Sequence, residues 1–69
     1  MELNDWIDEL GGVRRAASVL GVKWRTVDSW YYMQRSPSRF AAINIVIKSR
    51  GKVDFNGIYK PFLRKEADV

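Results

Sequence analysis

Residues 13–32, VRRAASVLGVKWRTVDSWYY, decide the fold that this sequence predicts. Apolar side chains recur at helical spacing on both sides of Gly21, which predicts one helix over residues 13–20 and another over residues 24–32. Glycine adopts the left-handed conformation that ends many helices at no steric cost, so Gly21 marks a tight turn between the two. The stretch therefore predicts a pair of short helices joined by a turn.

Five positions in this stretch have the size and spacing that two helices packed across such a turn require. The small side chain of Ala17 lets the helices approach where they cross, and Gly21 follows four residues later. We expect Val22 to enter the core just after the turn, and Val27 and Trp30 to pack the second helix on the first. This arrangement is typical of a helix-turn-helix.

Three further helices are predicted: one before this pair, over residues 4–10, and two after it, over residues 37–50 and 55–59. Each start carries a residue type that caps helices, namely Asn4, Ser36 ahead of Pro37, and Asp54. Pro61 is expected to end the last helix, because proline cannot donate a backbone hydrogen bond. We therefore expect one helix-turn-helix domain over residues 1–61 and a flexible tail over residues 62–69.

One stretch of the chain is ambiguous between helix and strand. Residues 42–47, AINIVI, are rich in β-branched side chains and could pair with residues 52–55 as a hairpin. The Ser-Pro start and the helical spacing of Phe40, Ile43 and Ile47 favour a helix with these side chains and Val46 facing inward. The expected fold class is all-α, with five short helices; α+β with a C-terminal β-hairpin at about residues 40–56 is the alternative.

The helix predicted over residues 37–50 carries more apolar side chains than one face can bury. Surplus apolar surface on a small protein suggests self-association. The predicted dimer patch consists of Ala42, Ile45, Phe55 and Tyr59. The alternative is that the last helix and the tail fold back over these side chains.

Charge is distributed unevenly along the chain. Residues 1–12 carry four acidic side chains and no basic one, whereas residues 13–52 carry nine lysines and arginines against the single acid Asp28. A basic middle segment behind an acidic start suits a surface that faces phosphates. Solvation of helix surfaces by Lys and Arg is the simpler explanation of the same pattern.

The composition argues against catalysis. The chain has no histidine and no cysteine, so it lacks the commonest general base and the commonest zinc ligands. We expect no enzymatic activity, no metal, no cofactor and no small-molecule ligand. The sequence contains neither an apolar run long enough to span a membrane nor a signal peptide, so a cytoplasmic location is expected.

A recognition helix shows its outward residues to base edges in the major groove. The side chains expected to contact bases are Trp24, Arg25, Asp28, Ser29 and Tyr32. Arg25 is the foremost of these, since an arginine fork pairs with guanine O6 and N7. The side chains expected to contact phosphates are Arg14, Arg15, Lys23, Arg35 and Arg39.

Across about residues 3–61, the pattern resembles the Cro repressors of lambdoid phages and the Cro-like regulators of prophages. The residues that carry the resemblance are Ala16-Ala17, Gly21-Val22, Val27, Trp30, Ser36-Pro37, Gly51-Lys52-Val53, Asp54, Ile58 and Pro61. It implies a transcriptional repressor that binds a pseudopalindromic operator in double-stranded DNA as a homodimer, in a bacterial host cell. Its base-reading positions fall on Trp24, Arg25, Asp28 and Ser29.

The chain also departs from this family. Family members usually have short polar side chains at the positions of Trp24 and Arg25, so an operator sequence does not follow from the resemblance. The family also has a branch with a C-terminal β-hairpin, which leaves both folds open. Other functions compatible with the scaffold are an antitoxin-like or anti-repressor interaction module and an architectural or excisionase-like DNA binder.

Overall fold

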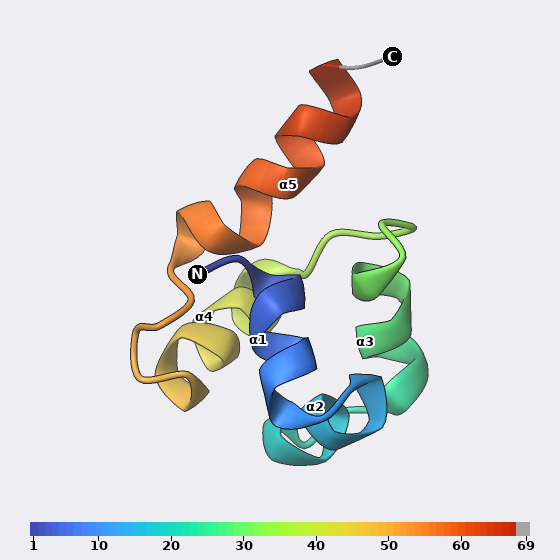
Figure 1. The fold of residues 1–69 in the computed structure, drawn as a ribbon, viewed down its shortest axis with the longest axis vertical. Helices are drawn as coiled ribbons and strands as arrows, with labels where there is room; N and C mark the ends of the chain where they lie inside the picture. The colour runs from blue at the N-terminus through green and yellow to red at the C-terminus, as the bar shows by residue number, and fades with distance from the viewer. Residues whose placement is uncertain (68–69) are drawn as a thin grey trace.

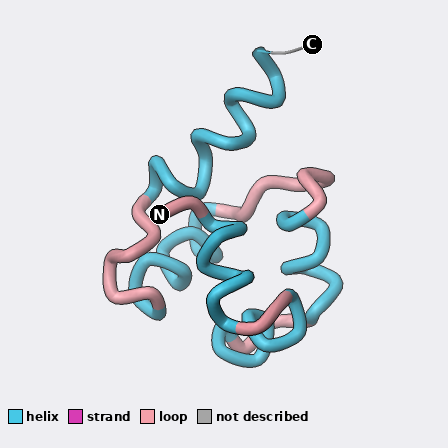
Figure 2. The backbone as a smooth tube through the Cα atoms, viewed as in Figure 1, coloured by secondary structure: helices cyan, strands magenta, loops and turns pink. Residues whose placement is uncertain are grey.

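The computed structural model describes residues 1–67, and within them it contains five helices and no strand (Figures 1 and 2). The helices are α1 (Leu3–Leu10), α2 (Val13–Leu20), α3 (Trp24–Tyr31), α4 (Arg39–Lys48) and α5 (Phe55–Ala67). The all-α prediction is confirmed. The alternative hairpin over residues 40–56 is wrong, because most of that stretch is helical.

The pair α2 and α3 forms as residues 13–32 predict. Gly21 adopts φ 71° and ψ 31°, the left-handed conformation expected at the turn, and the amide of Val22 donates to the carbonyl of Ala17. Ala17, Val27 and Trp30 are buried, and Val22 packs partly buried against them. Local spacing thus predicted the inward side of both helices.

One core holds the helices together, and α1 to α5 all reach it. Its buried apolar members are Leu3, Trp6, Ile7, Ala16, Ala17, Leu20, Val27, Trp30, Ala42, Ile45, Val53 and Ile58. Asn4, predicted to cap α1, lies inside that helix instead and donates from its side-chain amide to the Tyr31 carbonyl at 2.9 Å. This hydrogen bond ties α1 to the end of α3.

Helix α4 begins two residues later than predicted. Ser38, and not Ser36, is its N-cap, and the Ser38 hydroxyl accepts from the Ala41 amide at 3.2 Å. Pro37 lies before the helix, buried, and its carbonyl accepts a 2.9 Å hydrogen bond from the Tyr59 hydroxyl. That contact with α5 holds residue 37 in the connection from α3.

The inward side of α4 is the reverse of the predicted one. Ala42 and Ile45 are fully buried, whereas Phe40, Ile43 and Ile47 are exposed. Among polar residues, Asn44 helps to set this orientation, since its side-chain amide donates to the Leu20 carbonyl at 2.9 Å. The prediction failed because α4 is apolar on opposite sides, so spacing alone could not choose between them.

Helix α5 is longer than predicted. Asp54 caps it as expected, since its carboxylate accepts from the Gly57 amide at 2.8 Å. The helix does not stop at Pro61 but continues to Ala67, so residues 62–67 of the predicted flexible tail are helical; residues 68–69 lie outside the described residues. Figure 1 shows α5 changing direction and running away from the other helices.

None of the helices in the described part of the chain is long and apolar enough to cross a membrane.

Candidate nucleic-acid interface

The outward side of α3 carries the side chains expected to contact bases. Arg25, Asp28, Ser29 and Tyr32 recur at spacings of three and four, which places them on one face of a helix. Val27 and Trp30 occupy the other side and are buried in the core. Burial of one side therefore aims the polar face away from the protein.

An aromatic and two guanidinium groups cluster at the start of α3. The guanidinium carbon of Arg14, on α2, lies 4.5 Å from the centroid of the Trp24 ring, and that of Arg25 lies 5.7 Å from it. Both distances are within cation–π range. The indole thus gathers two positive charges from two helices at the beginning of α3.

This cluster changes the expected role of Trp24. Arg14 lies over the indole ring, so that ring is not fully available to pack on a thymine methyl group. Trp24 is 39 % exposed and sits between charged groups suited to phosphates. This geometry favours a role for Trp24 in positioning Arg14 and Arg25, and not in contacting a base.

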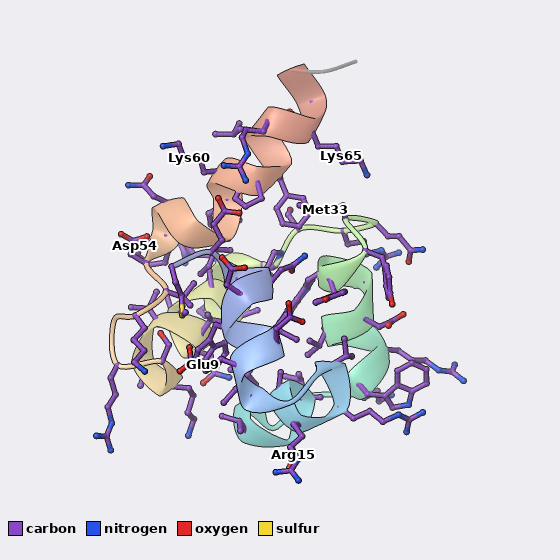
Figure 3. All side chains as sticks on the ribbon, in the orientation of Figure 1. Glu9, Arg15, Met33, Asp54, Lys60 and Lys65 are labelled. Atoms are coloured by element: carbon purple, nitrogen blue, oxygen red, sulfur yellow. The ribbon has the colours of Figure 1, made fainter. Side chains whose placement is uncertain are left out.

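Arg14 and Arg15 are neighbours in the sequence but lie on different parts of the surface. The stem of Arg15 packs over Gly11, in the turn between α1 and α2, and not over Trp24. Figure 3 shows Arg15 projecting from the end of the molecule opposite to α5. Of the two arginines predicted to contact phosphates, only Arg14 joins the start of α3.

A hollow of about 430 Å³ lies between α3 and the start of α4. Its lining residues are Arg25, Thr26, Ser29, Trp30, Arg35, Ser36, Ser38 and Ala41. It brings together Arg25 and Ser29, expected at bases, with Arg35, expected at a phosphate. The sequence analysis missed Thr26, Ser36 and Ser38, because only the path of the connection from α3 to α4 brings these hydroxyls to one hollow.

Two polar residues on the outer face of α3, Ser29 and Asp28, can accept hydrogen bonds from bases. The Ser29 hydroxyl donates to the Thr26 carbonyl at 2.7 Å, so its oxygen is left to accept, as from the amino group of a base. The two ion pairs among the described residues are Lys52–Glu9 and Arg64–Glu2, and neither includes Asp28. Asp28 can therefore also accept from a base.

The end of α3 carries two tyrosines with different partners. Tyr31 donates from its hydroxyl to the Asp8 carboxylate at 2.8 Å, which fixes α3 to α1. The Tyr32 ring meets that of Tyr31 edge-on, with centroids 5.2 Å apart, and remains exposed. Tyr32 is thus displayed one turn beyond Asp28, as predicted from its spacing.

Two acidic groups of the N-terminal segment, Glu2 and Glu9, form ion pairs away from α2 and α3. Glu9 meets Lys52 at 3.2 Å, and Glu2 meets Arg64 at 2.8 Å. Both partners belong to the C-terminal half of the chain. The positive charges of Arg14, Lys23 and Arg25, all exposed, are therefore not neutralised by these acids.

The predicted dimer patch is not assembled on the surface. Ala42 and Ile45 are fully buried and cannot contact another chain in this fold. Tyr59 is half-buried against Pro37, and Phe55 alone is well exposed. Arg39, expected at a phosphate, lies with its guanidinium carbon 5.3 Å from the centroid of the Phe40 ring on the outer side of α4.

Comparisons of the chain with protein-family models, with curated proteins and with solved structures find no match.

Proposed function

We propose that this protein is a sequence-specific DNA-binding repressor of the Cro type, with α2 and α3 as its helix-turn-helix. In this proposal α3 enters the major groove of a pseudopalindromic operator, and two copies occupy the two half-sites. Repression by occupying a promoter needs no catalysis, which suits a chain without His or Cys. A repressor of this type acts in the bacterial cytoplasm.

The observation that carries the proposal is the outer face of α3 beside the cluster of Arg14, Trp24 and Arg25. Hydrogen-bonding side chains lie along a helix face that the core does not use, and two guanidinium groups flank its beginning. Base-edge recognition and phosphate contact need these two features side by side.

Selection of bound duplexes from a random double-stranded library tests the proposal directly. We expect an enriched sequence with approximate two-fold symmetry. Affinity for it should fall by orders of magnitude between about 50 and 200 mM salt, because each phosphate contact releases counterions. A library without enrichment, or selected sequences bound no tighter than scrambled duplex, would refute the proposal.

Arg25→Ala tests the assigned face of α3. The variant should lose roughly 1–3 kcal/mol of binding free energy on the selected site and relax preference at one base pair per half-site. Lys60→Ala is the control, because it removes one positive charge from an exposed position on α5, outside α2 and α3. Equal losses on all sequences in both variants would mean that α3 does not read bases.

Failure to bind any duplex at low salt would favour an interaction module on the same scaffold. The exposed apolar residues of α4 are the observation behind that second function.

A further inference from the structure

The hollow of about 430 Å³ between α3 and the start of α4, which we name the α3–α4 hollow, is lined by basic and hydroxyl side chains. Arg25 and Arg35 line it together with Ser36 and Ser38. No aspartate or glutamate is among its lining residues, and neither arginine belongs to an ion pair of the described residues. Its lining therefore carries two positive charges with no counter-charge from the protein.

The indole of Trp30 adds a further donor to this lining. Trp30 lines the hollow and is 4 % exposed, so it is almost but not fully closed off. The described residues supply no acceptor for its N–H, and no fully buried side-chain nitrogen or oxygen among them lacks a partner, so the N–H reaches the surface. An indole N–H can only donate, so an acceptor in the hollow would satisfy it.

Backbone contacts hold the hollow in shape. The Ser29 carbonyl accepts from the amides of Gln34 and Arg35 at 2.8 and 3.2 Å, which folds the connection from α3 back on that helix. Farther along the connection, the Pro37 carbonyl accepts from the Tyr59 hydroxyl at 2.9 Å. A ligand that enters a site held by the fold avoids much of the cost of ordering it.

The start of α4 also favours an anion in the hollow. Ser38 and Ala41 both line it, so α4 begins there. The Ser38 oxygen accepts from the Ala41 amide, which leaves the hydroxyl proton to donate to a ligand. The N-terminal end of a helix carries a partial positive charge. These groups together suit a compact anion with several acceptor oxygens.

Charge and size select among such anions. A phosphate monoester carries about −1.5 to −2 charges near pH 7 and three acceptor oxygens, which matches two guanidinium groups, whereas each phosphate of a nucleic-acid backbone carries one charge. The volume of the hollow lies within the range of about 300–1,000 Å³ typical of small-ligand sites. We propose that the α3–α4 hollow binds the phosphate group of a phosphorylated small molecule through Arg25, Arg35 and the Trp30 N–H.

This site shares Arg25 with the face of α3 expected to contact bases. One guanidinium cannot hold a phosphate in the hollow and a guanine in the major groove at the same time. The phosphorylated ligand should therefore compete with DNA. That consequence rests on the proposed function, whereas the anion site does not. The sequence predicted no small-molecule ligand, because the hollow forms only when the connection folds back on α3.

Methyl phosphate and dimethyl phosphate are the probes, because they are similar in size and differ in charge. Each is titrated at constant ionic strength and about pH 8, above the second phosphate pKa of about 6, while the indole N–H resonances of isotope-labelled protein are followed. Methyl phosphate should shift the Trp30 resonance and bind at least about tenfold more tightly than dimethyl phosphate. Trp6, which is also 4 % exposed but lies on α1, is the internal reference and should not shift.

Arg35→Gln tests the site, with Arg39→Gln as a matched control. Both arginines are exposed and lie four residues apart, but only Arg35 lines the hollow. The guanidinium of Arg39 lies over the Phe40 ring instead. Arg35→Gln should weaken methyl phosphate binding by about tenfold or more, because a charged hydrogen bond is lost. Arg39→Gln should weaken it by less than about threefold.

Competition is measured on the duplex selected from the random library. Saturating methyl phosphate should lower the affinity of the wild type for this duplex by about tenfold, compared with dimethyl phosphate at the same ionic strength. Arg35→Gln should lose most of this effect, because it binds the anion weakly.

The outcomes separate the anion site from the proposed function. A methyl phosphate shift at Trp30 in a protein that binds no duplex supports the site, and the proposed function alone fails. Equal affinity for the two probes would assign the hollow to backbone phosphates and overturn the inference. A shift confined to Trp24, no shift of any indole, or equal affinities of Arg35→Gln and Arg39→Gln would overturn it as well.

Discussion

Ser49 is the one buried polar side chain in the described part of the chain. Its hydroxyl oxygen accepts from the Val53 amide at 3.1 Å, and the hydroxyl donates to the Val46 carbonyl at 3.2 Å. These bonds join the end of α4 to the turn before α5. A buried amide that loses its acceptor retains the cost of having been removed from water.

Ser49→Ala should therefore lower the free energy of unfolding by about 1–3 kcal/mol, measured by urea denaturation. Ser18→Ala, on the exposed side of α2, is the control and should change it by no more than about 0.5 kcal/mol. Equal stability of the two variants would show that the Val53 amide has another acceptor in solution.

Tyr31 makes stability dependent on pH in the alkaline range. The hydrogen bond to the Asp8 carboxylate, followed by the charge of that group, raises the pKa of the Tyr31 phenol above its usual 10.0. A raised pKa in the folded state contributes stability that is complete below the unfolded value and is lost as pH rises through the folded one. Tyr31→Phe removes this contribution.

The thermal midpoint of the wild type should exceed that of Tyr31→Phe by a constant margin below pH 10, the usual phenol value. Above that pH the margin should shrink. Tyr32→Phe, which removes the neighbouring exposed hydroxyl and keeps the bond of Tyr31 to Asp8, is the control. A margin for Tyr31→Phe that stays constant well above pH 10, the usual pKa of a phenol, would contradict the assignment.

At the scale of elements, the turn between α2 and α3 depends on the conformation of Gly21 and not on space. A Cβ added there would meet nothing within 4 Å, while its φ is +71°. The cost of a side chain is therefore conformational, since L-residues are strained in this region and Asn is strained less than Ala.

Gly21→Ala should destabilise the protein by about 1–2 kcal/mol and Gly21→Asn by less, as followed by urea unfolding. Helical circular dichroism should stay unchanged in both. Should the two variants lose equal stability, a contact of the side chain and not the backbone would control the turn.

At the scale of the whole molecule, Pro61 is the last residue of α5 that is buried, among residues 55–66. Beyond it, Phe62 is half-buried and residues 63–66 are exposed. Arg64 pairs with Glu2, and the Lys65 ammonium donates to the Met33 carbonyl at 2.6 Å. Figure 3 labels Lys65 and Met33. Exposed ion pairs contribute about 0–1 kcal/mol each.

A chain that ends at residue 61 should therefore unfold cooperatively in urea, with a loss of no more than about 2 kcal/mol. Circular dichroism should lose only the signal of the missing turns. A broad, non-cooperative transition would show that the second half of α5 is needed for the core. This prediction also tests residues 1–61 as the domain, which the fold by itself does not.

Part of the candidate site could be predicted from local sequence, and part depends on contacts between helices. The outer face of α3 followed from sequence, because helical spacing and the burial of Val27 and Trp30 leave Arg25 and Ser29 outside. The contact of Arg14 with Trp24, and the different position of Arg15, did not follow. They depend on how α2 lies against the start of α3.

The sequence by itself determined α1 to α3, the turn at Gly21 and the inward side of α2 and α3, because these depend on periodicity and backbone preference over a few residues. Between helix and hairpin for residues 40–56, it left both open. Only the tertiary structure decided which apolar side of α4 is buried and how far α5 extends past Pro61. In α4, the hydrogen bond from the Asn44 side-chain amide to the distant Leu20 carbonyl helps to choose between two apolar sides. In α5, burial of Pro61 offsets part of the helix-breaking cost of proline, about 3 kcal/mol. The orientation of α4 and the continuation of α5 past Pro61 are both stabilised by contacts between elements, and the local sequence does not contain these contacts.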